Sequence, residues 1–427
     1  MSRFGIFPFV GIGHLNPLTA LGRRLQARGH DVTVFQMPIA RAAIKASGLK
    51  FWPIDAEPGD MPAAIKQPQK ASDANRLSAV MRSMSSVEVI KANARRVLRG
   101  GPEAVRAAGV DALVVDQHDL AAGSVADLLG LPFVTVSVSP PVYLDDCAPL
   151  SYFGWPHSTG RIARFRNRLA NAVASRFIAP VLSIVNEKRR MWGLPQIDHL
   201  NEVFSKRALI TQLPEVLDFP CSHRPTNIFH AGPFHDGKGR LTVDFPWERL
   251  DRRPLVYASL GTILTSMPWV FRIIAEACSV LDVQLVISLG GGGLCPEDLA
   301  PLPGDPVIVH YAPQVDVLRR TRLVISHAGL NTTLESLAQG APLIAIPIVN
   351  DQPGVAARIR WAGVGTVIPL RRLSVRRLRK SIQNVLEDPA YRLAARRIQI
   401  AIQERDGLEC AAQLIERVLT TARAPSH

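Results

Sequence analysis

The segment from His327 to Glu335 contains residue types that can bind a diphosphate and a ribose. It lies where a predicted strand, 323–326, gives way to a helix that starts near Thr332. A helix N-terminus offers free N–H groups and the positive end of the helix dipole to an anion. His327 can donate to a phosphate oxygen, Gly329 lets the backbone approach closely, and Glu335 can accept from both ribose hydroxyls. The alternative for Glu335 is a capping box with Thr332, which would only start a helix.

His14 and Asp116 are the predicted acid–base pair. Both follow apolar, strand-like runs, at 4–10 and 112–115. The carboxyl ends of parallel strands meet at one edge of a sheet, so we expect the two side chains to lie close together. An imidazole with a pKa near neutrality can take a proton from an alcohol, and a carboxylate behind the ring stabilises the imidazolium. The alternative for a lone histidine after a strand is a polar loop residue.

Two successions of strands and helices must position these residues. The predicted strands are 4–10, 32–35, 49–54, 112–115 and 133–138, then 255–259, 284–289, 307–310, 323–326, 343–346 and 365–368. Asn16 is the predicted N-cap and Pro17 the predicted first residue of the first helix. The pattern predicts an α/β fold, with two facing Rossmann-like parallel-sheet domains and an interdomain cleft. The expected boundaries are a domain at 1–235, a linker at 236–254, a domain at 255–403, and a C-terminal helix at 404–427 that can cross back to the first domain.

The composition fits two folded domains and an anionic partner. The 427 residues are 47% hydrophobic, enough for two cores. The net charge of +14 attracts a nucleotide, an anionic membrane or nucleic acid. No zinc spacing or helix-turn-helix signal supports nucleic acid. No continuous run of about 18 apolar residues occurs, so we expect no transmembrane helix. Five scattered cysteines predict a reducing cytoplasm without a disulfide framework or zinc site.

The segment 327–335, followed by Gly340-Ala-Pro342 and Asp351-Gln352, resembles the signature of family 1 UDP-glycosyltransferases, which have the GT-B fold. The resemblance extends to Ser259-Leu-Gly261-Thr262, to Tyr311-Ala-Pro-Gln314 with tyrosine in place of the family's tryptophan, and to Gly13-His14-Leu-Asn16-Pro17. It implies that the N-terminal domain binds the acceptor and the C-terminal domain the UDP-sugar. The implied donor-binding residues are Ser259, Gly261, Thr262, Tyr311, Gln314, His327, Gly329, Asn331, Thr332, Glu335, Asp351 and Gln352; His14 is the implied base and Asp116 its partner.

The resemblance implies inverting transfer of a hexose, with glucose expected, and neither metal nor cofactor, since the UDP-sugar is a substrate. The chain has no D-x-D, the metal–diphosphate motif of the other large glycosyltransferase architecture. The second acidic residue of the retaining relatives is also missing, because the corresponding region reads Gly340-Ala-Pro-Leu343. The rival enzyme classes are a UDP-sugar 2-epimerase, which needs no acceptor, and a lipid-intermediate N-acetylglucosaminyltransferase.

The acceptor domain contains segments that resemble one branch of the family. These are 114–117 with 130–133, 211–220 and 229–232, and the branch glucosylates hydroxyls of carotenoids such as zeaxanthin. The resemblance implies a small hydrophobic hydroxylated acceptor. A macrolide, sterol or flavonoid is the alternative.

The stretch from Arg161 to Arg190 is predicted to form a basic amphipathic helix. Its apolar residues at helical spacing are Ile162, Phe165, Leu169, Val173 and Phe177, and its arginines around them are Arg161, Arg164, Arg166, Arg168 and Arg176. Such a helix can rest on an anionic membrane and would place a cytoplasmic enzyme on the membrane's cytoplasmic face. The alternative is that the apolar stripe packs into the domain and the arginines are solvated.

Overall fold

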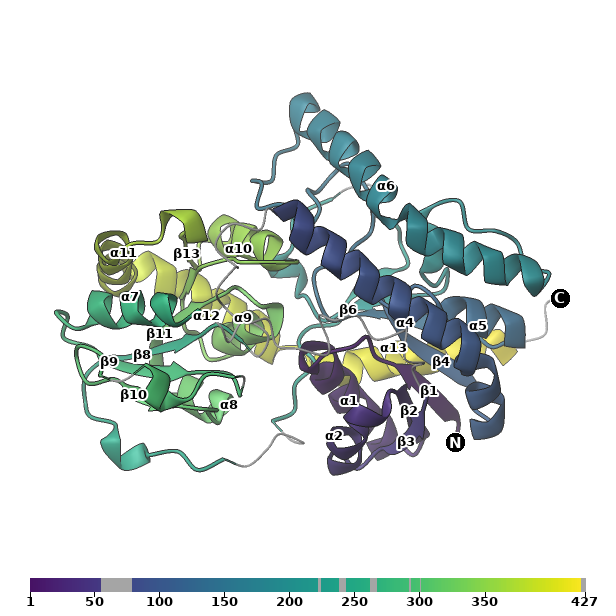
Figure 1. The fold of residues 1–427 in the computed structure, drawn as a ribbon, viewed down its shortest axis with the longest axis horizontal. Coiled ribbons are helices and arrows are strands. Elements are labelled where there is room, and N and C mark those ends of the chain that lie inside the picture. Colours follow the sequence, from purple (N-terminus) through teal and green to yellow (C-terminus); the bar gives the residue numbers. More distant parts are fainter. Residues whose placement is uncertain are drawn as a thin grey trace.

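The computed structural model describes residues 1–54, 79–221, 224–237, 243–261, 267–291, 293–299 and 301–423. They form two α/β units that lie side by side (Figure 1). The N-terminal strands are β1 (Arg3–Phe7), β2 (Asp31–Gln36), β3 (Lys50–Pro53), β4 (Ala112–Asp116), β5 (Phe133–Ser137), β6 (Leu209–Thr211) and β7 (Ile228–His230). The helices of this half are α1 (Ile12–Ala27), α2 (Arg41–Ala46), α4 (Ala79–Ala108), α5 (Ala122–Leu129) and α6 (Arg161–Met191).

The C-terminal half repeats this plan. Its strands are β8 (Leu255–Ser259), β9 (Gln284–Ser288), β10 (Val307–Val309), β11 (Thr321–Ser326), β12 (Leu343–Ala345) and β13 (Gly365–Val367). Its helices are α7 (Pro268–Cys278), α8 (Gln314–Leu318), α9 (Leu330–Ala338), α10 (Gln352–Trp361), α11 (Val375–Glu387), α12 (Pro389–Gln403) and α13 (Gly407–Arg423).

The two sheets have the same order over six strands, and β7 adds a seventh strand to the first sheet. The first runs β3-β2-β1-β4-β5-β6-β7 and the second β10-β9-β8-β11-β12-β13, and all their strand pairs are parallel. The order reverses between β1 and β4 and again between β8 and β11. In open α/β sheets, ligands bind beyond the carboxyl ends of the strands at such a reversal. The predicted α/β class with two Rossmann-like parallel sheets is confirmed.

Both faces of each sheet are buried, which explains the continuous apolar runs in the strands. Along β1, Phe4 and Ile6 pack on the side of α1, while Phe7 packs on the side of α4 and α5. Along β8, Val256 and Tyr257 likewise enter different cores.

The first helix begins earlier than the sequence suggested. Gly11 is the N-cap of α1, so Pro17 lies inside the helix and Asn16 is not its N-cap. The predicted start is therefore wrong. Gly11 has φ 128°, a backbone conformation that favours glycine, and it allows the chain to turn from β1 directly into α1. His14 consequently stands in the first turn of a helix rather than in a loop.

Strands β6 and β7 were not predicted. Each has three residues, and β7 lies in the stretch 220–254 that was interpreted as loop-rich. Three residues are too few for a periodic pattern, so pairing with the preceding strand defines them. They extend the N-terminal sheet to the segment that carries Gln212.

Helix α13 packs on the N-terminal domain. Leu408, Ala411 and Ile415 belong to the same core cluster as Leu18 and Leu21 of α1. The α1–α13 contact also includes an ion-pair cluster on its solvent side, made by Arg24, Arg28 and His30 with Asp406, Glu409 and Glu416. The chain therefore passes through both domains and returns to the first.

One expectation from composition is wrong, and one helix bears on the expectation that no helix crosses a membrane. Cys147 and Cys221 form a disulfide, although their separation of 74 residues gave no motif. By length and hydropathy, α6 is also able to cross a membrane, although it contains no uninterrupted apolar run; it is the one such helix among the residues that the structure describes. Only 22% of its most apolar window is buried inside the molecule.

Candidate functional site

His14 and Asp116 meet at the strand-order reversal of the N-terminal sheet. Asp116 is the last residue of β4, the neighbour of β1, and is fully buried. His14 Nδ1 lies 2.8 Å from Asp116 Oδ2. Since an ionised carboxylate only accepts, Nδ1–H is the donor and Nε2 is left to accept a proton from a substrate.

Backbone amides fix the Asp116 carboxylate. Phe9 N donates to Oδ2 at 3.2 Å and His118 N donates to Oδ1 at 2.9 Å. Burial alone would raise the pKa of Asp116, but the charges and hydrogen bonds of His14 and His118 hold this pKa well below its usual range. Asp116 is therefore ionised at neutral pH and stabilises an imidazolium at His14.

The pKa of His14 lies above its ordinary value. Burial lowers this pKa, but the charge and hydrogen bond of Asp116 raise it by more, and the charge of Asp351 adds to the rise. Asp351 belongs to the C-terminal domain, and burial raises its own pKa against the opposing charges of His118 and His14. The two domains thus contribute jointly to the electrostatics of the proposed base.

His118 is a residue of this site that the sequence analysis missed. Its Nδ1 lies 3.4 Å from Asp116 Oδ1, and its ring meets His14 edge-on with the centroids 5.0 Å apart. The available signal was its position two residues after Asp116, just beyond the end of β4.

The spacing of His14, Asp116 and His118 would also suit a metal ion, because their ligand atoms lie within 4.8 Å of one another. However, both Asp116 oxygens already accept backbone N–H groups, and Oδ2 also accepts from His14. This hydrogen-bonding pattern suits proton transfer better than metal binding. The second group of potential ligands in the described part of the chain includes Cys147 and Cys221, whose sulfurs are joined in the disulfide.

His327 follows β11 and is wedged between two glycines. A Cβ at Gly261 would lie 2.7 Å from ring atom Cε1, and one at Gly329 would lie 2.5 Å from Nε2. Ala328, which lies between His327 and Gly329 in the chain, has φ 63°. For a residue other than glycine this strained backbone conformation costs on the order of 1–3 kcal/mol, and it is typical of functional sites. These glycines therefore make room for the imidazole.

His327 is neutral at physiological pH. Burial lowers its pKa to about 4, against a backbone hydrogen bond with Ser259 that raises it. Its Nδ1 is buried and has no hydrogen-bond partner among the described residues. A neutral imidazole carries a single N–H, so His327 donates to an anion beside the N-terminus of α9 only when this N–H is turned from the Ser259 backbone to the anion.

Glu335 and Gln314, both predicted to touch the ribose, are hydrogen-bonded to each other. Gln314 Nε2 donates to Glu335 Oε2 at 2.7 Å, and Tyr257 Oη donates to Gln314 Oε1 at 3.0 Å. The N-cap of α9 is Gly329, so Thr332 lies inside the helix. The capping-box alternative for Glu335 is therefore wrong, and its buried carboxylate is held by Gln314 instead.

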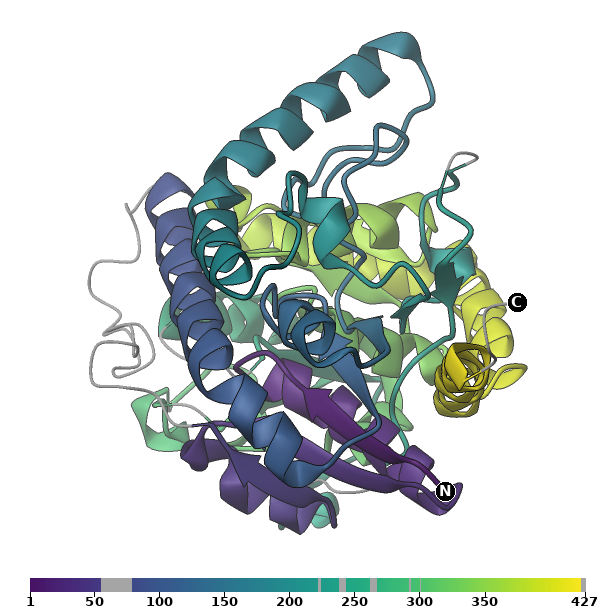
Figure 2. The ribbon, with the colours of Figure 1, turned by 90° about the vertical axis from the view of Figure 1, so that its right-hand side faces the viewer.

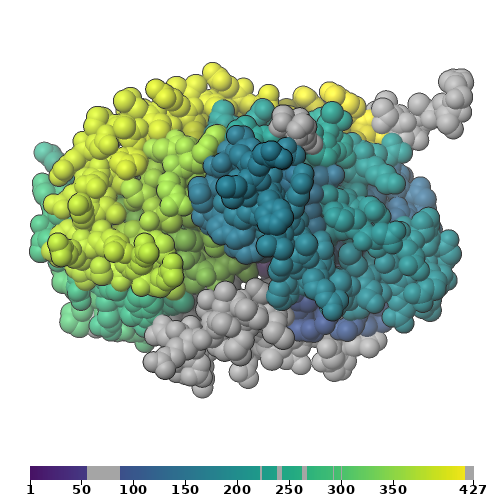
Figure 3. Space-filling view, turned by 90° about the horizontal axis from the view of Figure 1, so that it is seen from above, coloured from purple at the N-terminus to yellow at the C-terminus, as the bar shows by residue number. Residues whose placement is uncertain are grey.

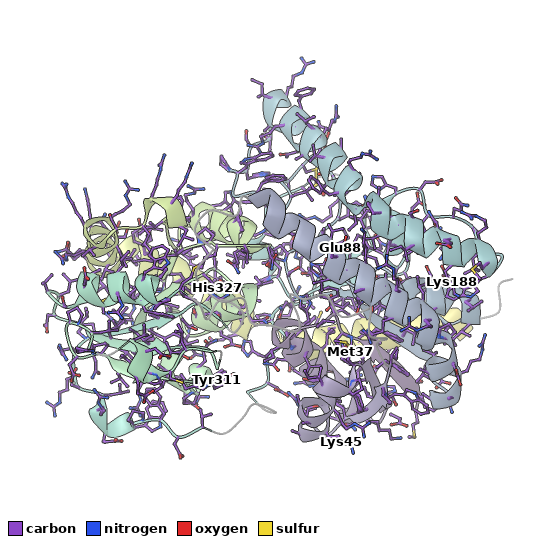
Figure 4. The ribbon with its side chains drawn as sticks, viewed as in Figure 1. Met37, Lys45, Glu88, Lys188, Tyr311 and His327 are labelled. Atoms are coloured by element: carbon purple, nitrogen blue, oxygen red, sulfur yellow. A yellow bond between two sulfur atoms is a disulfide. The ribbon has the colours of Figure 1, made fainter. Side chains whose placement is uncertain are left out.

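The structure also describes the surroundings of Tyr311 and Ser259, two further predicted donor-binding residues. Tyr311 and His327 lie on the side of the domain that faces the N-terminal domain (Figure 4). A Cβ at Gly291 would lie 3.3 Å from the Tyr311 ring, so the glycine-rich loop after β9 packs on this side chain. Ser259 Oγ accepts from Gly261 N at 3.3 Å. Thr262 lies outside the described residues.

Asp351 and Gln352 occupy the N-terminus of α10. Asp351 is its N-cap residue, but its side chain makes no capping hydrogen bond. Gln352 is buried, and its Oε1 accepts from Ile348 N and Val349 N at 2.9 Å each. Gln352 therefore fixes the loop that presents Asp351, while only its amide N–H groups are left for a sugar.

Asn331 connects the two domains. Its Nδ2 donates to the carbonyl of Gly13 at 2.8 Å, and its Oδ1 accepts from Gln212 Nε2 at 2.8 Å. Asn331 was predicted to bind the donor, but its side chain contacts the N-terminal domain. Gln212 follows β6, and the sequence analysis gave it no role.

Comparisons with known proteins agree with this fold. The family model described as UDP-glucoronosyl and UDP-glucosyl transferase matches residues 8–404. The chain is 29% identical to the zeaxanthin glucosyltransferase of Pantoea ananas, over 99% of this chain and 97% of that one. It is 30% identical to that of Pseudescherichia vulneris, over 100% of both chains. The crystal structure of CalG4, the calicheamicin glycosyltransferase, has a TM-score of 0.73 at 21% identity and 99% coverage of each chain.

The chain belongs to the UDP-glucoronosyl and UDP-glucosyl transferase family, and it is a glycosyltransferase with the GT-B fold. The family membership predicted from the 327–335 segment is confirmed. A nucleotide-sugar donor and an acceptor are therefore its two substrates.

Proposed function

We propose that the protein transfers a hexose, most simply glucose, from a UDP-sugar to a hydroxyl of an apolar acceptor, with inversion and without a metal ion. The preferred acceptor is a carotenoid such as zeaxanthin. The observation that carries the chemistry is the 2.8 Å contact between His14 Nδ1 and Asp116 Oδ2.

In the proposed reaction, His14 Nε2 removes the proton of the acceptor hydroxyl while its oxygen attacks the anomeric carbon of the sugar. The bond from that carbon to the diphosphate oxygen breaks, and UDP leaves with the electron pair. A single displacement of this kind inverts the anomeric centre. Asp116 stabilises the imidazolium that forms. His327 and the N-terminal amides of α9 stabilise the charge on the departing diphosphate, which is the task a metal performs in other enzymes.

The proposed acceptor is supported by two observations. Phe9 is half-buried, and its ring lies edge-on to His14 with the centroids 5.4 Å apart, so an aromatic surface borders the base. The two zeaxanthin glucosyltransferases noted above align over nearly the whole chain, which includes the acceptor domain. Because apolar alcohols of this size partition into membranes, the proposal places a cytoplasmic enzyme at the membrane surface.

The test is an incubation of the purified protein with UDP-glucose and one acceptor at a time: a hydroxylated carotenoid, a sterol, a flavonoid or a macrolide. Mass spectrometry reads the gain of one hexosyl unit, and NMR reads the anomeric configuration of the product. We expect product from the carotenoid, equally with EDTA and with added magnesium. Parallel reactions with dTDP-glucose test the nucleotide.

Three outcomes would contradict the proposal. Turnover lost with EDTA and restored by magnesium or manganese would exclude the metal-independent mechanism. Efficient transfer to the flavonoid or the macrolide alone would show that the acceptor is not a carotenoid. Conversion of UDP-glucose without any acceptor would favour the 2-epimerase.

A further inference from the structure

Helix α6 has two different apolar faces. One packs on the N-terminal domain: Val181 and Val185 are fully buried in the core beside α4 and α5, and Ala163 and Ala170 are buried on the same side. The second face consists of Ile162, Phe165, Leu169, Val173 and Phe177, whose exposed fractions are 86, 69, 60, 45 and 42%. The alternative that this stripe packs into the domain is therefore wrong.

The exposed stripe is continuous. Its residues follow at intervals of three or four, so they occupy one side of the helix over about four turns. In Figures 1 and 2, the N-terminal half of α6 projects away from the rest of the molecule. The space-filling view from above shows the teal segment that contains this helix on the surface facing the viewer (Figure 3). A continuous apolar stripe that the described part of the molecule leaves exposed is typical of an interaction site.

The charge around the stripe defines the partner. Between Arg161 and Arg176 there are five arginines and no acidic residue. Asp146 pairs with Arg164 and Arg168, at 3.1 and 2.7 Å. Arg166 stacks on Trp155 with its guanidinium 4.8 Å from the ring centroid, whereas Arg161 and Arg176 are exposed. Two chains of net charge +14 that met through this face would oppose arginine to arginine, which disfavours self-association.

We propose that the exposed face of α6, from Ile162 to Phe177, is the surface by which the protein docks on a membrane of anionic lipids. The apolar side chains enter the boundary between headgroups and acyl chains, and the flanking arginines bind the lipid phosphates. The inference goes beyond the transfer reaction and holds whichever alcohol is the acceptor.

The helix lies on the membrane rather than across it. A spanning helix would have to withdraw Val181 and Val185 from the domain core, and Arg189 from its 2.7 Å contact with Asp127. These contacts hold the C-terminal half of α6 on the protein. The hydropathy that suits a membrane span arises because the helix is apolar on both its core side and its exposed side.

The segment that precedes the docking face contacts the helix that presents Asp351. The segment 138–160 joins β5 to α6, and within it the Ser151 carbonyl accepts from Gly354 N at 2.8 Å. Gly354 stands three residues after Asp351 in α10. Docking through α6 would therefore bring the acceptor domain and the Asp351 loop toward the lipid surface together.

The experiment is co-sedimentation of the full chain with phosphatidylglycerol vesicles and with phosphatidylcholine vesicles. The apolar test variant is Phe165→Ser with Leu169→Ser, and its matched control is Leu393→Ser with Ile400→Ser, whose side chains are 54 and 53% exposed on α12. The charge variant changes Arg161, Arg164, Arg166 and Arg168 to glutamine. Its matched control changes Arg371, Arg372, Arg376 and Arg377, four arginines of the C-terminal domain that lie at its surface.

We expect binding to the anionic vesicles that weakens with salt and falls about tenfold or more in each α6 variant. Both controls should bind like the unchanged protein. All variants should keep their thermal unfolding temperature and their turnover of an acceptor dissolved in detergent micelles, so failure of docking and failure of the proposed function are read separately. Binding that ignores lipid charge and the α6 changes, resistance to extraction at alkaline pH, or a dimer abolished by Phe165→Ser with Leu169→Ser would each overturn the inference.

Discussion

The side-chain amide of Asn331 donates to the carbonyl of Gly13, the residue before His14, at 2.8 Å. This carbonyl lacks its usual backbone partner in the helix because of Pro17. In an α-helix the carbonyl of residue 13 normally accepts from the N–H of residue 17, and proline has none. The proline inside α1 thus leaves an acceptor beside the proposed base, and the C-terminal domain uses it.

Asn331→Asp should lower kcat/KM about three- to tenfold, because it removes the donor to Gly13 but keeps an oxygen for Gln212, and one hydrogen bond contributes roughly 0.5–1.5 kcal/mol. In a Pro17→Ala background the same change should cost less, since the backbone N–H that alanine restores at this position can then satisfy the carbonyl. Steady-state kinetics of the four proteins in a double-mutant cycle measures the coupling. Strictly additive effects would show that Pro17 and Asn331 act independently.

His14→Ala should lower kcat by about two to four orders of magnitude, because a general base contributes about that much. UDP affinity, measured by titration calorimetry, should stay unchanged, since His14 belongs to the N-terminal domain and is hydrogen-bonded to Asp116 of the same domain. His118→Ala serves as the comparison, because it leaves the contact between His14 and Asp116 intact. A smaller loss is expected for this variant, and near-normal turnover of His14→Ala would exclude the mechanism.

Asp116→Asn should shift the pH profile. The base acts when His14 is neutral, so kcat/KM rises with pH through the His14 pKa, which Asp116 holds above its ordinary value. Without this charge, burial lowers that pKa, and the acidic limb should move to lower pH. The plateau should also fall, by less than in His14→Ala but still substantially, because the imidazolium loses its partner. A limb that stays in place would mean that Asp116 does not set the pKa.

Much of the fold could be predicted, because strands covered on both faces have unbroken apolar runs. The strands 255–259 and 343–346 were placed within a residue of β8 and β12. The start of α1 was predicted wrongly because Asn16 and Pro17 carry the local signal of a helix start. That signal cannot reveal that Gly11, with its positive φ, begins the helix earlier.

The site was predictable where its residues follow strands, because strand ends determine which residues meet. The contact between His14 and Asp116 is of this kind. The roles of Gln212 and the side chain of Asn331 depend on how the two domains and the later strands pack, which no local pattern encodes. The same limit applies to α6, where the residue spacing indicates an apolar stripe but not which side of the helix is covered.

Glu335 provides the sharpest test of donor recognition. Its buried carboxylate has one oxygen on Gln314, and we expect it to bind the ribose hydroxyls of UDP. Glu335→Ala should weaken UDP binding about 10- to 100-fold, since hydrogen bonds to a charged group contribute roughly 1.5–3 kcal/mol. The Michaelis constant for the donor should rise with little change in kcat, because the ribose contact is the same in the ground and transition states.

The control for Glu335 is a change in the ligand. The unchanged protein should bind 2′-deoxy-UDP more weakly than UDP, and Glu335→Ala should bind the two alike, because the group that distinguishes them is gone. Glu335→Gln, which keeps an acceptor oxygen, should retain part of the discrimination. Calorimetric titration of the three proteins with both ligands gives the coupling directly, and thermal unfolding checks the loss of the Gln314 hydrogen bond. If Glu335→Ala still prefers UDP as strongly as the unchanged protein, Glu335 does not bind the ribose and serves only to hold Gln314.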